Sequence, residues 1–412
     1  MHVVIVGAGQ AASQVITGLR QSGSECEITL IGDEADLPYQ RPPLSKKFLA
    51  GAMDKERLYF KPATYYSESG IDVKTNCHVT RIDRGRKQVF CGESQVISYD
   101  KLVLATGSRP RKLPIPNIQL NGIYDLRSIA DIEAIRLQTT PGKKLVIVGG
   151  GYIGLETAAS CKKLGLDVTI LEAATRVLER VADPDMSAYF SGLHESHGVD
   201  IKTSVQIDSF RSTADGTHVN GVVFKDGSEM DADFIIMGVG IVPNVELAEA
   251  AGLDVDNGII VNENGMTSDP NIFAAGDNTN HPNDLLRRRL RLESVPNAIE
   301  QAKAVTAQLL GDTKPYHQIP WFWSDQYDTK LQIIGLADGA DRVHMRGDMA
   351  ENSFARFHFK GDQLIAVEAV NRPAEFMASR QLVPLAAQGQ TIDSEMLIDP
   401  EITPKHWLKV VA

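Results

Sequence analysis

Apolar residues in this chain gather in short runs that alternate with amphipathic stretches. The run VVIV (residues 3–6) leads into a glycine-rich turn, a helix is expected over residues 11–23, and the run ITLI (28–31) follows. The same order returns in LVIV (145–148), a helix through residue 156 and VTIL (168–171). Short apolar runs joined by helices are typical of parallel strands buried on both faces. The pattern predicts an α/β fold.

The pattern occurs twice along the chain. Two apolar strands that end in glycine, LVLATG (102–107) and FIIMGVG (234–240), occupy matching places after the two glycine-rich turns. Shorter elements fill the space between: helices over 62–69 and 185–197, strands over 78–83, 87–90 and 200–203, and a β-rich portion over 206–230. A repeat of this kind predicts two copies of one doubly wound domain.

The remaining segments divide the chain further. The Pro-rich stretch 110–116 is expected to be an extended linker, and residues 271–277 and 295–310 to form a strand and an amphipathic helix that return to the first domain. From residue 321 onward, strand-like runs at 331–335, 355–359 and 364–370 precede a helical end. We therefore predict a discontinuous domain (1–112 and 244–319), a second domain (113–243) and a C-terminal α+β domain (320–412).

Composition limits the possible functions. The chain has 412 residues, 43% hydrophobic and 23% charged, which is ordinary for a globular protein. No apolar run is long enough to span a bilayer, and the chain opens directly on a core strand, so we expect no membrane segment, no signal peptide and a cytoplasmic location. A net charge of −11 argues against a nucleic-acid partner.

Two further features concern charge and sulfur. The segment LLRRRLR (285–291) concentrates arginine in an acidic chain, and although such a run is usually a solvated face, it makes Arg287, Arg288, Arg289 and Arg291 candidate partner-binding residues. Cys26, Cys77, Cys91 and Cys161 have neither C-x-x-C nor metal-ligand spacing. No metal site is expected, and the thiols are interpreted as buried or incidental.

The two glycine-rich turns match the dinucleotide fingerprint. In such a turn the first glycine allows the tight bend, the second lets backbone amides approach a pyrophosphate, and the third small residue packs helix on strand. The helix N-terminus then presents unpaired N–H groups to the anion. The candidate cofactor-binding residues of the two turns are Gly7, Gly9, Gln10 and Ala11, and Gly149, Gly150, Gly151, Tyr152, Ile153 and Gly154.

Acidic residues follow the next strand in both copies. Asp33 and Glu34 follow the first, and Glu172 follows the second. A carboxylate at this position accepts hydrogen bonds from an adenosine ribose, although a single one can also be a solvated strand end. Glu172 would repel a 2′-phosphate, which favours NADH over NADPH, and the nearby Arg176 tempers that preference. The chain is thus expected to hold two dinucleotides.

These motifs together resemble the FAD- and pyridine-nucleotide-dependent disulfide oxidoreductases with the glutathione-reductase-type fold. The resemblance rests on GAG (7–9), LPYQRPPLSK (37–46), ATG (105–107), GGGYIG (149–154), GVG (238–240) and AAGD (274–277), which keep their order over nearly the whole chain. Within that superfamily the chain is similar to the NADH:ferredoxin reductases of bacterial oxygenase and cytochrome monooxygenase systems, most specifically through RPPLSK (41–46).

The resemblance implies roles for individual residues. The domain 1–112 with 244–319 would bind FAD, residues 113–243 would bind NADH, and 320–412 would form an interface domain. Lys46, near the isoalloxazine edge, and Glu156, at the nicotinamide amide, would be the catalytic residues, although the two can also form a plain structural ion pair. The FAD contacts implied are Asp33 or Glu34, Arg41, Lys46, Val79, Ala105, Thr106, Gly107, Arg127, Asp277, Val295 at its helix N-terminus, and Trp323. The additional NADH contacts implied are Glu156, Glu172, Gly238, Val239 and Gly240.

The chain departs from the superfamily at its redox centre. Glutathione-reductase-type enzymes carry C-x-x-x-x-C, and related oxidases a single redox cysteine, where this chain has PYQRPPLSK (38–46) without cysteine. Without a thiolate, electrons must leave the flavin directly for an outside acceptor. We expect this acceptor to be an acidic [2Fe–2S] ferredoxin steered by the arginines, with Trp321 and Trp323 as further candidates for that surface.

Two alternatives stay open at this point. The acceptor can be rubredoxin, a quinone-like molecule or monodehydroascorbate, since those reductases share much of the scaffold. A non-catalytic, NADH-sensing flavoprotein similar to apoptosis-inducing factor also has a stretch like RPPLSK, but the compact length argues against it. Both a monomer and a homodimer are compatible with the sequence.

Overall fold

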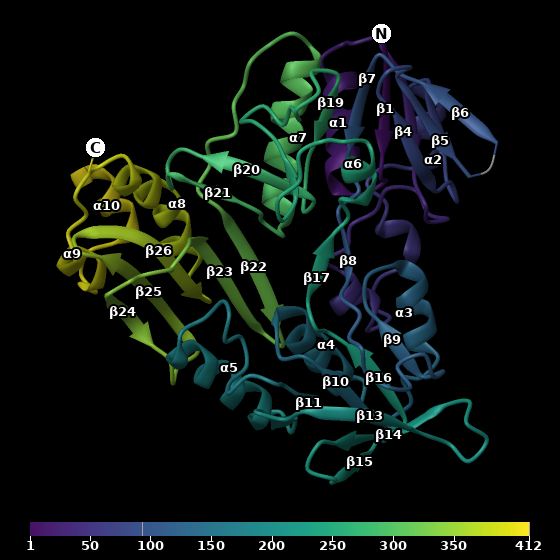
Figure 1. Cartoon of the computed structure of the whole chain (residues 1–412). Helices are drawn as coiled ribbons and strands as arrows, with labels where there is room; N and C mark the ends of the chain where they lie inside the picture. Colours follow the sequence, from purple (N-terminus) through teal and green to yellow (C-terminus); the bar gives the residue numbers. More distant parts are fainter. Residues whose placement is uncertain (93, 412) are drawn as a thin grey trace.

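The computed structural model describes residues 1–92 and 94–411 and contains three sheet-centred units (Figure 1). The first is a parallel five-stranded sheet in the order β19-β7-β1-β2-β3. Its strands are β1 (His2–Val6), β2 (Glu27–Ile31), β3 (Ile71–Lys74), β7 (Lys101–Leu104) and β19 (Ile272–Ala274). Helices α1 (Gln10–Gln21) and α7 (Val295–Leu309) pack against each other, and their apolar sides share one core with β1 and β2. The apolar runs are strands because both faces of this sheet are buried.

The second unit is another parallel five-stranded sheet, in the order β12-β11-β10-β16-β9. Its strands are β9 (Ile123–Asp125), β10 (Lys144–Val148), β11 (Asp167–Leu171), β12 (Asp200–Lys202) and β16 (Phe234–Met237). Its helices are α3 (Ile129–Arg136), α4 (Tyr152–Lys163) and α5 (Pro184–Ser196). Asp183 caps α5 by accepting a hydrogen bond from the backbone N–H of Met186, and Pro184 begins that helix, where a missing N–H costs nothing.

The predicted repeat is confirmed strand by strand. β1, β2, β3 and β7 have the same order and direction as β10, β11, β12 and β16. Each copy also carries an antiparallel three-stranded meander. The meander strands are β4 (Val79–Asp83), β5 (Gln88–Cys91) and β6 (Gln95–Ser98) in the first copy, and β13 (Ile207–Ser212), β14 (Val219–Phe224) and β15 (Glu229–Asp231) in the second. The copies differ in the fifth strand, because β9 precedes its sheet along the chain whereas β19 comes after the whole second sheet.

A two-stranded antiparallel ribbon connects the two sheets. β8 (Ser108–Pro110) pairs with β17 (Ile241–Pro243), so the chain enters and leaves the second unit side by side. Residues 111–115 after β8 have no regular structure, as expected for the linker. We propose domain boundaries at 112/113 and 243/244, close to the ends of β8 and β17. Smaller elements complete the first unit: η1 (Leu44–Phe48), η2 (Lys55–Arg57), α2 (Ala63–Glu68), α6 (Glu246–Ala250), β18 (Ile259–Ile260), β20 (Thr279–Asn283) and β21 (Arg288–Leu290).

The third unit is an antiparallel sheet in the order β22-β23-β26-β25-β24, with helices on one face (Figure 1). Its strands are β22 (Trp321–Gln326), β23 (Thr329–Gly335), β24 (Arg342–Asp348), β25 (Ser353–Lys360) and β26 (Gln363–Val370), followed by α8 (Pro373–Ala387), α9 (Ser394–Ile398) and α10 (Pro404–Val411). The α+β character is confirmed. The strands β22 and β24 are additions to the sequence prediction.

Alternate side chains of strand β25 enter two different cores, one with the C-terminal helices and one with the second unit. Ala355, Phe357 and Phe359 lie in the core formed with the C-terminal helices, whereas Phe354 lies in the core that contains the second sheet. The buried Arg356 points the same way as Phe354 and pairs with Asp183. This period-two alternation places the sheet between its own helices and the second domain. In the part of the chain described here, no helix is long and apolar enough to cross a membrane.

Candidate functional site

The first glycine of each fingerprint is fixed by close packing. Gly7 has φ +105°, and a Cβ there would lie 2.1 Å from the carbonyl oxygen of Ala105. Gly149 has φ +111°, and its Cβ would lie 2.4 Å from the carbonyl oxygen of Gly238. Only glycine combines this backbone with this approach. The two turns are therefore packed against the ends of the glycine-ending strands, so residues 105–107 and 238–240 lie directly beside them.

The second glycine of each fingerprint is open on the side where a Cβ would be. Gly9 and Gly151 have no heavy atom within 4 Å of that point among the described residues, and each begins a helix without a side-chain cap. At Gly154, by contrast, a Cβ would lie 2.1 Å from the carbonyl oxygen of Gly149. Unblocked glycines at the starts of α1 and α4, with uncapped N–H groups, suit a pyrophosphate. The residues present thus fit two dinucleotides.

The side chains of Tyr152 and Ile153, in the second fingerprint, have different surroundings. Ile153 is 50% exposed beside the second turn. Tyr152 instead packs edge-on against Phe322 of β22, 5.1 Å between ring centroids, and its buried hydroxyl has no partner among the described residues. Tyr152 therefore contacts the third unit, which the fingerprint alone does not predict. Gln10 and Ala11 open α1, with Ala11 buried.

Glu172 lies against the second turn. One carboxylate oxygen accepts the Gly150 N–H at 2.7 Å and the other accepts the Ala174 N–H at 2.8 Å. Arg176 donates to the carbonyl of Ala182 and to Ser187 Oγ at the start of α5. The partners of Glu172 are backbone N–H groups and those of Arg176 are neutral oxygens, so the two side chains form no ion pair among the described residues.

Of the two acidic residues after β2, Glu34 is the one built into a network. Its carboxylate pairs with Arg41 at 2.5 Å and accepts the Tyr39 hydroxyl at 2.5 Å. Arg41 also donates to the backbone carbonyl of Arg127 at 2.6 Å. Asp33 is exposed and makes no side-chain hydrogen bond to another described residue. Both oxygens of the Glu34 carboxylate are thus engaged within the protein, so Asp33 and Glu34 both stay candidates for the adenosine ribose.

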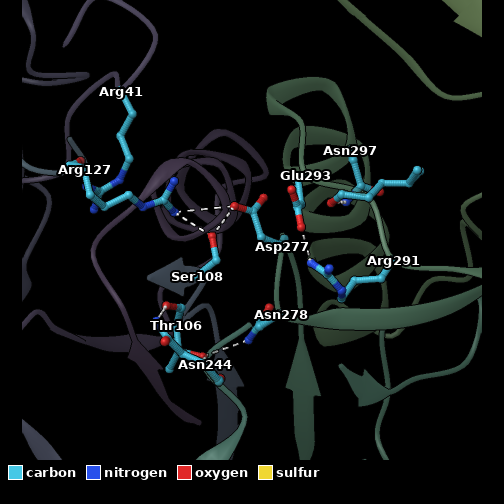
Figure 2. A network of polar contacts seen from close by, with 12 residues as sticks. Arg41, Thr106, Ser108, Arg127, Asn244, Asp277, Asn278, Arg291, Glu293 and Asn297 are labelled. Carbon is cyan, nitrogen blue, oxygen red and sulfur yellow. Dashed lines mark hydrogen bonds and ion pairs between the residues drawn. The ribbon is translucent and has the colours of Figure 1, made fainter. Parts of the chain in front are cut away.

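Arg127 and Asp277 meet across the site, as Figure 2 shows. Ser108 Oγ donates to Asp277 at 2.8 Å and accepts from Arg127 at 3.0 Å, and Arg127 lies 3.4 Å from the same carboxylate oxygen. Burial, together with the nearby Arg41, lowers the pKa of Arg127. Its Nε is buried with no partner among the described residues. This buried N–H without a partner suits an acceptor atom on a bound cofactor.

Thr106 anchors the turn that follows β7. Its hydroxyl donates to the carbonyl of Asn244 at 2.8 Å, and Asn244 returns a bond to the Thr106 carbonyl at 2.8 Å. Asn278 donates to Thr106 Oγ1 at 3.0 Å (Figure 2). The adjacent Gly107 carbonyl accepts the Asn244 N–H. These bonds join the ends of β7, β17 and β19 at one edge of the site.

The start of helix α7 is capped by Ser294, whose side chain accepts the Asn297 N–H. Asn297 donates to the Leu292 carbonyl at 3.0 Å, while its own buried side-chain oxygen has no partner among the described residues. Val295, the first helical residue, is half-buried. An orphaned acceptor beside this helix start is a second place where a cofactor group would complete the bonding.

Lys46 and Glu156 form a buried ion pair of 2.6 Å. Glu156, on α4, is 4% exposed, and Lys46 lies in η1, which packs against α4. Ser45 also donates to the carboxylate at 2.7 Å, and Ser324 of β22 donates to its other oxygen at 2.7 Å. One segment from each of the three units therefore meets at this carboxylate.

The predicted arginine cluster divides into two parts. Arg289 is held by the carbonyls of Val261 and Asn280, and Arg291 pairs with Glu293 at 2.6 Å. Arg288 is exposed and pairs with Asp338 at 3.0 Å, and Arg287 is exposed at the turn of the β20–β21 hairpin. Arg287, Arg288 and Arg289 are all exposed to a partner, whereas Arg291 is partly buried.

The remaining predicted contacts lie in ordinary packing. Val79 is buried at the start of β4, opposite Cys91. Trp323 lies 5.8 Å from Trp321, measured between ring centroids, and Trp321 is covered by Arg380 and Phe376. Trp321 thus belongs in part to the core of the third unit.

All four cysteines are free, and three of them are buried. Burial and the neighbouring Cys77 thiol raise the pKa of Cys91 to about 12, and burial raises that of Cys161 to about 12. The proximity of Cys77 to Cys91 is not visible in their spacing along the sequence.

Sequence reasoning missed the serines and Tyr39. Ser45 and Ser108 each adjoin a recognised motif, RPPLSK and ATG, which is a signal that could have found them. Ser324 lies in no recognised motif, and its partner is 168 residues away.

Comparison with known proteins places the chain in a family. Residues 1–302 match the model of the pyridine nucleotide-disulphide oxidoreductases, and residues 321–408 match the reductase C-terminal domain. The chain belongs to this family and is an oxidoreductase of the type that uses FAD and a pyridine nucleotide.

Individual relatives are reductases of bacterial electron-transfer systems. The chain is 46% identical over 385 residues to putidaredoxin reductase of Pseudomonas putida, covering 93% of this chain and 91% of the relative. It is 43% identical over 383 residues to rhodocoxin reductase of Rhodococcus erythropolis, covering 93% and 89%. Among solved structures it superimposes on the reductase of the covalent putidaredoxin reductase–putidaredoxin complex with a TM-score of 0.95 and 43% identity, covering 100% of this chain and 98% of that one.

Proposed function

We propose that this protein takes two electrons from NADH into FAD and delivers them singly to an acidic [2Fe–2S] ferredoxin that serves an oxygenase. The observation that carries the proposal is the Lys46–Glu156 pair, which joins the two dinucleotide-binding halves at a segment without cysteine. Because no thiolate is available there, electrons have no protein disulfide to enter. The relatives that are reductases of one-electron carriers support the same acceptor class.

The residues would divide the work of holding FAD. The Gly7–Gly9 turn would bind the pyrophosphate, Asp33 or Glu34 the adenosine ribose, and Asp277 with Arg127 the flavin end. FAD, when bound, supplies hydride acceptance and stepwise release of two electrons. Lys46 would keep a positive charge at that end, and Glu156 would hold the Lys46 ammonium in place.

The second turn would bind NADH in preference to NADPH. Glu172 is held beside the turn by two backbone N–H groups, and Arg176 is engaged elsewhere. A 2′-phosphate would therefore meet a carboxylate that forms no ion pair among the described residues.

The acceptor distinguishes this proposal from its alternatives. NADH-driven reduction of cytochrome c should be slow with the enzyme alone and should rise in proportion to an added [2Fe–2S] ferredoxin. NADPH, measured in parallel, should support a lower rate. Fast cytochrome c reduction without any iron–sulfur protein would refute the proposal, since it would point to a direct or quinone-type acceptor.

The docking surface is proposed to include Arg287 and Arg288. Replacing both with alanine should lower the on-rate of an acidic ferredoxin and flatten the dependence of that rate on ionic strength. Arg86→Ala is a matched control, because Arg86 is an exposed arginine after β4, in the meander at the opposite end of the first unit from the β20–β21 hairpin (Figure 1). Equal salt dependence in the double variant and the wild-type protein would remove these arginines from the surface.

A further inference from the structure

A chain of buried hydrogen bonds leads from Glu156 into the third unit. Ser324 Oγ donates to Glu156 Oε1 at 2.7 Å, and Gln326 Nε2 donates to Ser324 Oγ at 3.2 Å. Gln326 Oε1 lies 2.9 Å from His194 Nε2, and the Tyr327 hydroxyl lies 3.2 Å from His194 Nδ1. Ser324 and Gln326 are 1% exposed and His194 is fully buried.

In this series of hydrogen bonds, each donor is oriented toward the carboxylate of Glu156. A neutral imidazole has one N–H and one acceptor nitrogen. With the Tyr327 hydroxyl donating to Nδ1, the N–H lies at Nε2 and faces the carbonyl oxygen of Gln326. Because the Gln326 carbonyl oxygen accepts from His194, the Gln326 NH₂ group faces Ser324 and donates to its Oγ. The Ser324 O–H is then left to donate its hydrogen bond to Glu156. The protonation site follows from this pattern of partners.

Ser324 is the one donor to Glu156 that comes from the third unit. Lys46 and Ser45 both contact Oε2, and within the described residues the side-chain donor to Oε1 is Ser324. Rotation about the Cγ–Cδ bond of Glu156 moves both carboxylate oxygens, and a hydrogen bond at each oxygen restrains that rotation. Because the Lys46 ammonium contacts Oε2, a rotation of the carboxylate would displace it as well.

We propose that Ser324, oriented by Gln326 and His194, is a positioning residue for the Lys46–Glu156 pair. The C-terminal domain thereby takes part in the reduction of the flavin by NADH, in addition to any role in docking an electron acceptor. This inference rests on the NADH-to-flavin step of the proposed function and is independent of which acceptor follows.

Rapid mixing of the FAD-loaded enzyme with NADH, followed by flavin absorbance, tests the inference. Ser324→Ala should slow flavin reduction about ten-fold, the size expected for one hydrogen bond to a charged group. Reoxidation by ferricyanide should stay within about two-fold. Ser324→Thr, which keeps the hydroxyl, should recover most of the rate. Ser379→Ala is the matched control, because Ser379 is fully buried in the same domain and its hydroxyl has no partner among the described residues.

A second readout does not depend on activity. Urea unfolding of the loaded enzymes should give a non-additive cycle for Ser324→Ala and Glu156→Gln, and an additive one for Ser379→Ala and Glu156→Gln. Equal flavin-reduction rates in Ser324→Ala and Ser379→Ala, or an additive Ser324 cycle, would overturn the inference. A wild-type enzyme that NADH does not reduce would refute the proposed function instead, and the unfolding cycle would still test the Ser324–Glu156 contact.

Discussion

Because His194 is buried, we predict that mild acid measurably lowers the free energy of unfolding. The side chain is fully buried, and burial lowers its pKa to about 4, against an ordinary 6.5, with the Gln326 contact opposing the shift. Between these values the unfolded chain binds a proton that the folded protein excludes, so stability is complete above about pH 7 and falls as the pH drops toward 4. The full difference corresponds to roughly 3 kcal/mol, of which about 2 kcal/mol is lost between pH 7 and pH 5.

The assay is urea unfolding at pH 7 and pH 5, followed by circular dichroism at one fixed FAD concentration. His281 is also buried with its pKa lowered to about 4, first by burial and then by Arg289, so it adds a similar loss. His194→Gln should remove about 2 kcal/mol of the acid destabilisation and leave the part that belongs to His281. His406→Gln, at an exposed position on α10, is the control and should behave as the wild-type protein. If His194→Gln loses as much stability on acidification as the wild type, His194 is not buried as a neutral group.

Three further variants test separate features. Gly7→Ala should destabilise the protein by at least about 2 kcal/mol and prevent flavin retention, because the new methyl group would lie 2.1 Å from the Ala105 carbonyl oxygen at φ +105°; a yellow, stable variant would contradict this. Glu172→Ala should narrow the preference for NADH by about ten-fold in kcat/KM, measured with both nucleotides, and an unchanged ratio would exclude Glu172 from the ribose site. Arg356→Ala should cost about 3 kcal/mol in urea unfolding, because the buried Glu368 loses its guanidinium partner and keeps the His358 contact, and a loss below 1 kcal/mol would show that the pair is not desolvated.

Local pattern was sufficient to predict the two nucleotide-binding units. Each strand–turn–helix unit is encoded within a few neighbouring residues, as at Gly7 and Gly149, where the backbone conformation alone demands glycine. Periodicity also predicted the ends of α7 closely. Ser294, a favourable cap, lies directly before the helix and accounts for where it starts.

What the sequence could not predict depends on contacts between distant segments. β22 was missed because WFWSDQ does not alternate apolar with polar residues, and it is a strand because β23 pairs with it. Ser324 reaches Glu156 only through that pairing. The arginine run looked like one surface, yet Arg289 and Arg291 are held by local acceptors that no spacing reveals.

The place of β19 has a consequence for how the protein is made. The second sheet is built wholly from residues 123–237, so it can close as soon as that part of the nascent chain has left the ribosome. The first sheet lacks its edge strand until residues 272–274 are synthesised, although its other four strands emerge much earlier. The half begun first is thus completed last, and until then β7 presents an unpaired edge to its surroundings.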